Sequence, residues 1–150
     1  MTLRKSMQRL LVALITLLFL IPGAAIAASA DDVVGIWLTV GGKSHVQITQ
    51  AGGQYSGNLI WLKEPLRNGK PKMDDKNPDA KLRTRPLVGL SLLSGFTFKN
   101  GEWVNGKIYN PEDGKTYACQ MKLKNANTLE VRGYVMGMTA LGKTQVWTRK

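Results

Sequence analysis

Cysteine and histidine are nearly absent from this 150-residue chain, which holds one of each, Cys119 and His45. A lone cysteine excludes an intrachain disulfide. Protein zinc sites combine several cysteine, histidine or carboxylate ligands, so we expect no metal site and no cofactor. Cys119 alternates with Tyr117, Met121 and Leu123, which predicts a strand with a buried, structural thiol on its apolar face.

Acidic side chains are scarce: the chain has 10 of them against 21 basic ones, a net charge of +11. Such a surface favours anionic partners, although a purely solubilising role for the charge is equally compatible with the composition. Proteins that bind single-stranded nucleic acid interleave basic residues with aromatic ones. The most basic segment, 63–85, contains no aromatic residue, so we expect no nucleic-acid partner.

Long apolar runs are confined to the N-terminus. Three basic residues precede the apolar run 10–21, and Pro22-Gly23 ends it. A spanning helix needs about 20 apolar residues, and this run is shorter. The pattern is therefore typical of a cleavable secretory signal peptide over residues 1–30, and a membrane anchor is the second interpretation.

Small-residue triplets of the kind that precede signal cleavage occupy 25–27 and 28–30. We therefore expect cleavage before Ala28 or Asp31, and a mature chain that is periplasmic or secreted. Removing the three basic residues of the leader lowers the net charge to +8. No membrane span is expected after cleavage.

The remaining residues, 31–150, are long enough for one domain with one core. Their apolar residues alternate with polar ones, a period of two that predicts strands rather than helices. Turn residues such as Gly52-Gly53 and Asn100-Gly101 separate the alternating segments. The expected strands span residues 34–40, 45–50, 54–62, 96–99, 102–109, 116–124, 128–134 and 143–149.

About eight short strands joined by tight turns predict an all-β fold with an antiparallel sheet. A small up-and-down barrel would remove the sheet edges and leave room for one small ligand. A sandwich of two sheets is the alternative. Residues 87–93 are expected to form a short helix or a buried turn before the sheet resumes.

The segment 63–85 interrupts the alternation and holds eight basic and four acidic residues. Long loops of this kind are usually functional or disordered. We interpret it as a mobile flap over one end of the barrel, with a solvated insertion as the alternative. Its candidate docking residues for an anionic partner are Lys70, Lys72, Arg83 and Arg85.

Two segments match familiar binding motifs, but the residues around them do not support the corresponding function. Residues 137–144 match the phosphate-binding P-loop pattern, but the alternating residues after Thr144 exclude the helix that this motif requires. Asp75, Asn77 and Asp79 have the start of a calcium-loop spacing without its glycine and its glutamate. Since no catalytic constellation is visible either, we expect a protein that is not an enzyme.

Charged and aromatic residues share strand faces near the C-terminus. Gln145, Trp147 and Arg149 lie on one face of the last expected strand, which should pair with 128–134. This pairing predicts that Arg132 and Arg149 lie near Trp147, and near Trp37 of the first strand. We interpret Trp37, Trp147 and Arg149 as a structural closure of one barrel end, with a ligand contact as the alternative.

Two resemblances extend this prediction. Gly35-Ile36-Trp37 together with Arg149 resembles the signature of the calycin superfamily, which includes lipocalins, and in those barrels the tryptophan packs under a late-strand arginine. Nearly the whole mature chain resembles a bacterial exported family, domain of unknown function 2147. The resemblance implies a lipocalin-like barrel without an established activity. The matching stretches are residues 77–79, 83–89, 105–117, 129–134 and 141–149.

The leading functional hypothesis is a non-enzymatic module that binds a small lipid-like or amphipathic anionic ligand in the barrel. Its apolar part would contact Tyr117, Met121 and Leu123, and Arg132 or Lys107 would meet its charged head. The alternative is an interaction protein whose basic loop docks on anionic envelope polymer or on a partner protein.

Overall fold

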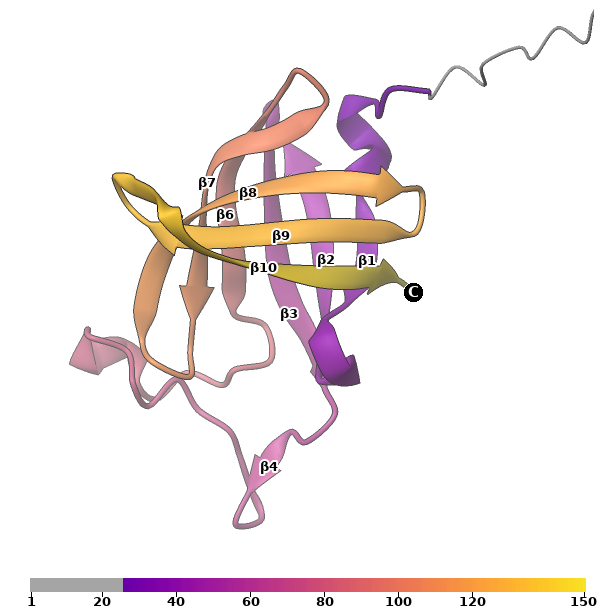
Figure 1. The fold of residues 1–150 in the computed structure, drawn as a ribbon. Coiled ribbons are helices and arrows are strands. Elements are labelled where there is room, and N and C mark those ends of the chain that lie inside the picture. The colour runs from indigo at the N-terminus through magenta and orange to yellow at the C-terminus, as the bar shows by residue number, and fades with distance from the viewer. Residues whose placement is uncertain (1–25) are drawn as a thin grey trace, which may run out of the picture.

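The computed structural model describes residues 26–150, and most of the expected signal peptide, residues 1–25, lies outside the described residues. The described chain forms one closed antiparallel barrel (Figure 1). This confirms the prediction of an all-β, up-and-down barrel of about eight strands. The barrel strands are β1 (Gly35–Leu38), β2 (Ser44–Ala51), β3 (Gln54–Leu62), β6 (Ser91–Lys99), β7 (Glu102–Asn110), β8 (Lys115–Asn125), β9 (Thr128–Val135) and β10 (Met138–Arg149).

Barrel strands that follow one another in the chain pair side by side, with β3 pairing directly with β6, and β1 closes the barrel by pairing with β10. The closing pair is short: Trp37 faces Arg149 and Leu38 faces Thr148. The β9–β10 ladder is longer and includes eight paired positions, with an irregularity between Met138 and Gly142. The period-two pattern therefore predicted all eight barrel strands, because one face of each strand is buried, although β6 and β10 begin five residues earlier than expected.

The segment between β3 and β6 differs from the prediction. Residues 87–93 form neither a helix nor only a turn, because β6 already begins at Ser91. The loop before it is ordered by backbone pairing, which the absence of alternation did not predict. It contains the short hairpin of β4 (Leu66–Arg67) and β5 (Lys70–Pro71) and the 3-10 helix η3 (Ala80–Leu82).

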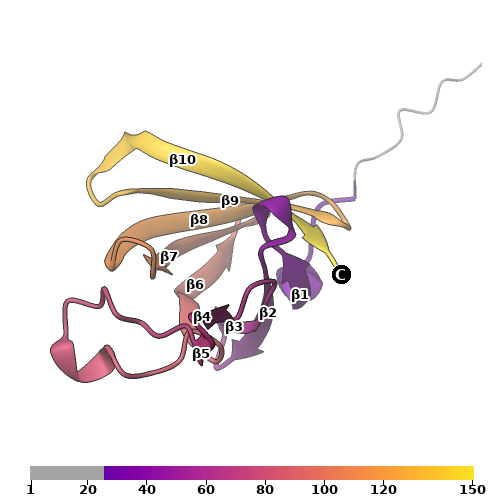
Figure 2. The same cartoon turned by 90° about the horizontal axis from the view of Figure 1, so that it is seen from below.

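The barrel has two unlike ends. The 3-10 helix η1 (Ala30–Val33) precedes β1 and lies at one end, which we call the closed end. The β2–β3, β6–β7 and β8–β9 turns share that end. The other end, the open end, carries the 3-10 helix η2 (Val40–Gly42), the 63–90 loop, the β7–β8 turn and the β9–β10 turn; Figure 2 views the molecule from below.

Large side chains fill the barrel from the closed end to its middle. The biggest are three tryptophans and Phe96, all at most 2% exposed. The middle of the barrel is therefore occupied by buried side chains, like the core of an ordinary globular protein. The buried cluster comprises Val33, Trp37, Val46, Ile48, Tyr55, Leu93, Phe96, Trp103, Cys119, Met121, Leu129, Val131 and Trp147.

A strand glycine makes room for one of these side chains. A Cβ on Gly106 would lie 2.3 Å from the ring of Phe96, which is fully buried. At Gly133, on the same inner surface, the nearest atom to such a Cβ is Ile108 Cγ2, at 3.4 Å. Gly106 is therefore a packing requirement, and Gly133 is not.

We predict that Gly106→Ala lowers the free energy of unfolding by about 1–3 kcal/mol, because the added methyl group must displace a core ring. Gly133→Ala is the matched control, because it places the same methyl group in a strand where it fits. Its expected effect is neutral, or stabilising by up to about 1 kcal/mol. Urea unfolding of the two variants measures the difference, and equal stabilities would contradict the prediction.

Candidate functional site

Arg149 closes one end of the barrel. Its guanidinium carbon lies 4.3 Å from the ring centre of Trp37, a cation–π arrangement. The same group donates three hydrogen bonds of 2.6–3.1 Å, so its polar edge is used while its face covers the indole. The prediction that Trp37 lies under Arg149 is confirmed. The three acceptors are the backbone carbonyls of Asp32, Val34 and Ala126.

The position two residues before Trp37 requires a glycine, Gly35. A Cβ at that position would lie 2.7 Å from Nη1 of Arg149. Its φ of 142° is also a backbone conformation that other residues rarely adopt. The Gly-x-Trp pattern therefore places the arginine as well as the indole.

Helix η1 is attached to the closed end by side chains from the barrel. Trp37 Nε1 donates to the carbonyl of Val33 at 2.8 Å, and Trp103 Nε1 donates to that of Ala30 at 3.0 Å. The hydroxyl of Tyr55 donates to Asp31 Oδ1 at 2.6 Å. Each buried indole N–H thereby gains a partner, and the closed end is sealed.

The inner wall of the open half is different on the β8–β10 side, where it remains exposed to solvent, whereas Leu59 and Leu93 keep the β3–β6 side buried. Gln145 accepts a hydrogen bond from Nε1 of the buried Trp147, so it shares the inner face with that ring. Lys143 lies two residues further along the same face, opposite Gly133. Both side chains are exposed, and Tyr117 on β8 is only half-buried. Water therefore reaches this part of the inner wall.

Of the residues predicted to bind a ligand, the apolar ones do face inward. Met121 and Leu123 pair with Val131 and Leu129 on the inner surface. Met121 is 1% exposed and lies within the packed half of the barrel. Tyr117 alone belongs to the exposed half, and its hydroxyl donates to Asp113 Oδ2 at 2.6 Å.

The two cations predicted to meet a charged head group lie on the outer surface, so their placement inside the barrel is wrong. Arg132 pairs with Thr144, one residue out of phase with Trp147, and alternate residues of a strand point to opposite faces. Its guanidinium donates to Thr144 Oγ1 and to the carbonyl of Thr139. Lys107 pairs with Ala118 and shares that outward phase. Arg132 therefore contacts neither Trp147 nor the barrel interior.

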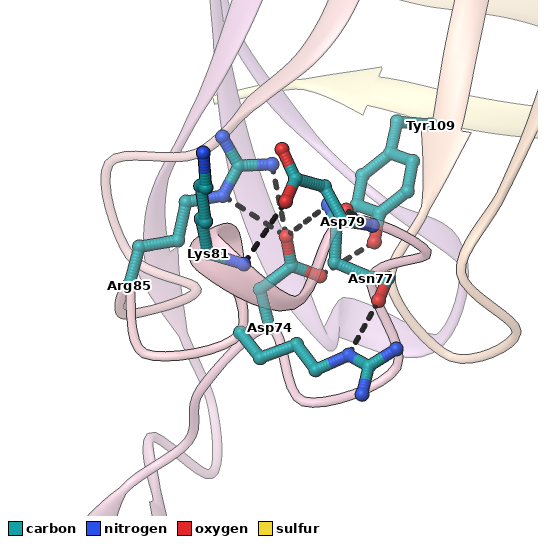
Figure 3. A network of polar contacts seen from close by, with 7 residues as sticks. Asp74, Asn77, Asp79, Lys81, Arg85 and Tyr109 are labelled. Carbon is teal, nitrogen blue, oxygen red and sulfur yellow. Dashed lines mark hydrogen bonds and ion pairs between the residues drawn. The ribbon is translucent and has the colours of Figure 1, made fainter.

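A buried carboxylate organises the 63–90 loop (Figure 3). Asp74 has no exposed surface, and Arg85 Nη2 lies 2.9 Å from its Oδ2. Arg85 Nε donates to the same oxygen, as does Asn77 Nδ2, while the hydroxyl of Tyr109 donates to Oδ1. Because Tyr109 belongs to β7, this carboxylate attaches the loop to the barrel wall.

The surroundings of Asp74 favour its charged form. Burial alone would raise the pKa of the carboxyl, but hydrogen bonds from Tyr109, Asn77 and Arg85 and the charge of Arg85 outweigh it, so the pKa is lowered. Burial and the bond to Asp74 raise the pKa of Tyr109 to about 12. The pair is therefore a phenol donating to an ionised carboxylate at neutral pH.

A second contact joins the loop to the β7–β8 turn. A Cβ at Gly114 would lie 1.9 Å from the carbonyl oxygen of Lys76. The φ of Gly114 is +71°, so this position requires glycine on both counts. The two attachments show a loop docked on β7 and on the β7–β8 turn, which differs from the predicted mobile flap. The polar composition of the loop is explained by hydrogen bonds within it.

Three of the four candidate docking cations hold this loop together. Arg85 pairs with Asp74, and Arg83 Nε donates to the carbonyl of Asn77 at 2.7 Å. Lys72 lies 3.8 Å from Glu64. Among residues 26–150, only Lys70 of the four makes no side-chain hydrogen bond or ion pair.

The metal-ligating and nucleophilic side chains of the described residues form no further candidate site. Within residues 26–150, no cluster of three or more histidine, cysteine, aspartate or glutamate side chains is arranged to hold a metal ion. Nδ1 of His45 lies 3.4 Å from Lys150 Nζ, and its ring stacks on Trp61. Cys119 is fully buried, as predicted, and burial raises its pKa to about 12.

Two surface hollows lie outside the barrel interior. One of about 430 Å³ adjoins the closed end beside Asp32 and Arg149, and 26–28 form part of its wall. A smaller one of about 90 Å³ lies on the outer face beside Arg132 and Glu130. In the described part of the chain, no helix has the length and apolar character needed to cross a membrane.

Comparisons with known proteins identify the family to which this barrel belongs. Residues 35–149 match the family model described as "Uncharacterized protein conserved in bacteria (DUF2147)". The chain belongs to this family. A solved structure, protein HP1028 from the human pathogen Helicobacter pylori, described as belonging to the lipocalin family, is 30% identical, with a TM-score of 0.69. The match covers 78% of this chain and 82% of that one. No curated protein matches the chain.

Two features of this DUF2147 barrel were missed from the sequence. The alternation along the last strand places Gln145 on the same face as Trp147, and it also places Lys143 there. The inward position of Lys143 could therefore have been predicted from the sequence. The role of Asp74 was not, because its partner Tyr109 is 35 residues away and the loop between them has no periodicity.

We predict that Asp74→Asn lowers the free energy of unfolding by about 1–3 kcal/mol at pH 7, because it removes the charge that pairs with the partly exposed Arg85 and replaces one buried acceptor oxygen with an amide that cannot accept. Because the folded-state pKa of Asp74 is lowered, its stabilising contribution is present above the unfolded pKa of about 4 and is lost as the pH falls through the folded pKa.

The wild type should therefore lose this contribution below about pH 4, and the Asn variant has none to lose. Denaturant unfolding between pH 2.5 and 7 measures both effects. Asp75→Asn is the matched control, because Asp75 pairs with Arg67 at the surface and should contribute less than about 1 kcal/mol. A pH profile of Asp74→Asn parallel to that of the wild type would contradict the assignment.

Proposed function

We propose that this chain is an exported, non-enzymatic protein that binds a small amphipathic anion in the open half of its barrel. The lipocalin-like fold supports a small-ligand site, since such barrels of eight strands hold one small molecule. The observation that carries the proposal is an asymmetry of the barrel: its closed half is packed with side chains, whereas its inner wall on the β8–β10 side of the open half reaches solvent.

The chemistry of that wall supports an amphipathic ligand. Ile108 and the ring of Tyr117 offer apolar surface, and their residues face each other across the β7–β8 ladder. Gln145 offers an amide, and Lys143 a cation, on the neighbouring β9–β10 wall. A ligand with a short apolar body and an anionic head matches this combination, with Lys143 in the role first assigned to Arg132 or Lys107.

Export to the periplasm or the medium rests on the N-terminal pattern of basic, apolar and small residues. A non-enzymatic role is supported by the surroundings of the one histidine, whose ring nitrogen faces Lys150 instead of a carboxylate. The alternative, docking through the basic loop, is less favoured because Arg83 and Arg85 are occupied within the loop.

We predict that Lys143→Glu weakens binding of the amphipathic anion 1-anilinonaphthalene-8-sulfonate by roughly tenfold, equivalent to about 1.4 kcal/mol. The matched control is Lys107→Glu, which makes the same charge change on the outer wall and should leave the affinity within about twofold. Fluorescence titration at 0.15 M salt, where distant charges are screened, measures both. Equal losses in the two variants, or no saturable binding by the wild type, would count against the site.

The contacts of η1 favour one of the two expected cleavage positions. Cleavage before Asp31 would remove Ser29, whose backbone and hydroxyl both bond to Asp32, and Ala30, whose carbonyl accepts from Trp103. A buried indole N–H would then lack its partner. We therefore predict that the exported protein begins at Ala28. The intact mass of protein purified from its own envelope tests this, and a mass matching residues 31–150 would contradict it.

A further inference from the structure

Charge is distributed unequally between the two ends of the barrel. The open-end segments 39–43, 63–90, 110–115 and 135–143 hold 11 basic and 6 acidic residues, a net +5. The closed-end segments 26–34, 51–54, 99–102, 125–128 and 149–150 hold three of each. The excess positive charge is therefore concentrated at one end and along the outer wall.

Exposed apolar side chains gather at the same end. Among residues 26–150, 13 large apolar residues are exposed, and ten of them lie on the open-end segments or on the adjoining end of β3. Four of them, Val135, Met136, Met138 and Leu141, fall within seven residues at the β9–β10 tip, and Leu141 is 63% exposed. This tip and η3 project to the same side of the molecule in both views (Figures 1 and 2).

The geometry points to an anionic lipid bilayer as the partner of the open end, with the β9–β10 tip inserted among the lipids and the lysines of the 63–90 loop on the head groups. Interfacial binding of this kind combines buried apolar surface with attraction of basic residues to anionic lipid. The tip supplies the first element, and exposed Lys76 and Lys81 supply the second.

A bilayer fits this surface better than a protein does. Eight of its eleven basic residues are lysines, and lysine is depleted from protein interfaces, where arginine is enriched. The apolar residues also stand on the tips of separate loops, interrupted by charged residues. A fluid lipid surface accommodates separate tips without a matching shape, whereas a protein partner must supply a complementary one.

Vesicle flotation tests the proposal with the full exported chain and no added ligand, so its result is independent of the barrel site. The wild type should bind vesicles of 70% phosphatidylcholine and 30% phosphatidylglycerol, and bind pure phosphatidylcholine at least about tenfold more weakly. The double variant Met138→Ser/Leu141→Ser should bind the anionic vesicles at least about tenfold more weakly than the wild type. Val146→Ser, which removes an apolar residue of 44% exposure from the outer wall, should bind as the wild type does.

The electrostatic part has its own matched pair. Lys76→Glu/Lys81→Glu should lose vesicle binding, whereas Lys99→Glu/Lys124→Glu, with the same change in charge at the closed-end limits of β6 and β8, should retain most of it. If the serine variant binds as tightly as the wild type while charge reversal abolishes binding, the surface recognises charge alone, as on an anionic polymer. That outcome, or no binding to anionic vesicles, overturns the proposal.

Insertion is read directly from a probe on the tip. Met138→Cys and Val146→Cys can each be labelled with an environment-sensitive dye in the folded protein, because Cys119 is fully buried. On anionic vesicles the emission of the dye at 138 should shift to the blue, and that at 146 should not. Vesicle binding without a shift at 138 also overturns insertion of the tip.

Discussion

The contact of Arg149 with Trp37 and with three backbone carbonyls is the interaction on which the rest of the structure depends. The closing strand β1 has only four residues and pairs with β10 at two positions, so its own ladder is weak. Arg149 adds bonds that join η1, β1 and the β8–β9 turn. Its planar group can stack and donate at once, which a lysine cannot.

Sealing one end determines where function can reside. With Trp37, Trp103 and Trp147 filling the closed half, no ligand can occupy the whole length of this barrel, as it does in barrels with a continuous cavity. The binding proposed for this barrel is therefore left to the open half, which carries two loops of different character. On one side the 63–90 loop is attached through a buried carboxylate, and on the other the β9–β10 tip projects with its apolar residues exposed.

The fold was predictable to a useful extent because alternation reports directly on the two faces of a strand. It gave the inward phase of Cys119, Met121 and Trp147 and the packing of Trp37 under Arg149. It failed for Arg132, because whether residues on two paired strands share a face depends on the register of the pair, and the alternation within each strand does not give that register. It also failed for Asp74, whose burial depends on Arg85 and Tyr109 together, a tertiary contact without a local pattern.

Closure of the barrel through Arg149 also affects how fast the chain can fold. Arg149 contacts the carbonyl of Val34 across 115 residues of sequence, and contacts between distant residues form slowly because a long loop must first be closed. Every fragment that lacks the C-terminus keeps two open sheet edges. For a chain that is exported unfolded, the barrel therefore cannot close before β10 has crossed the membrane, which delays folding until that strand has emerged.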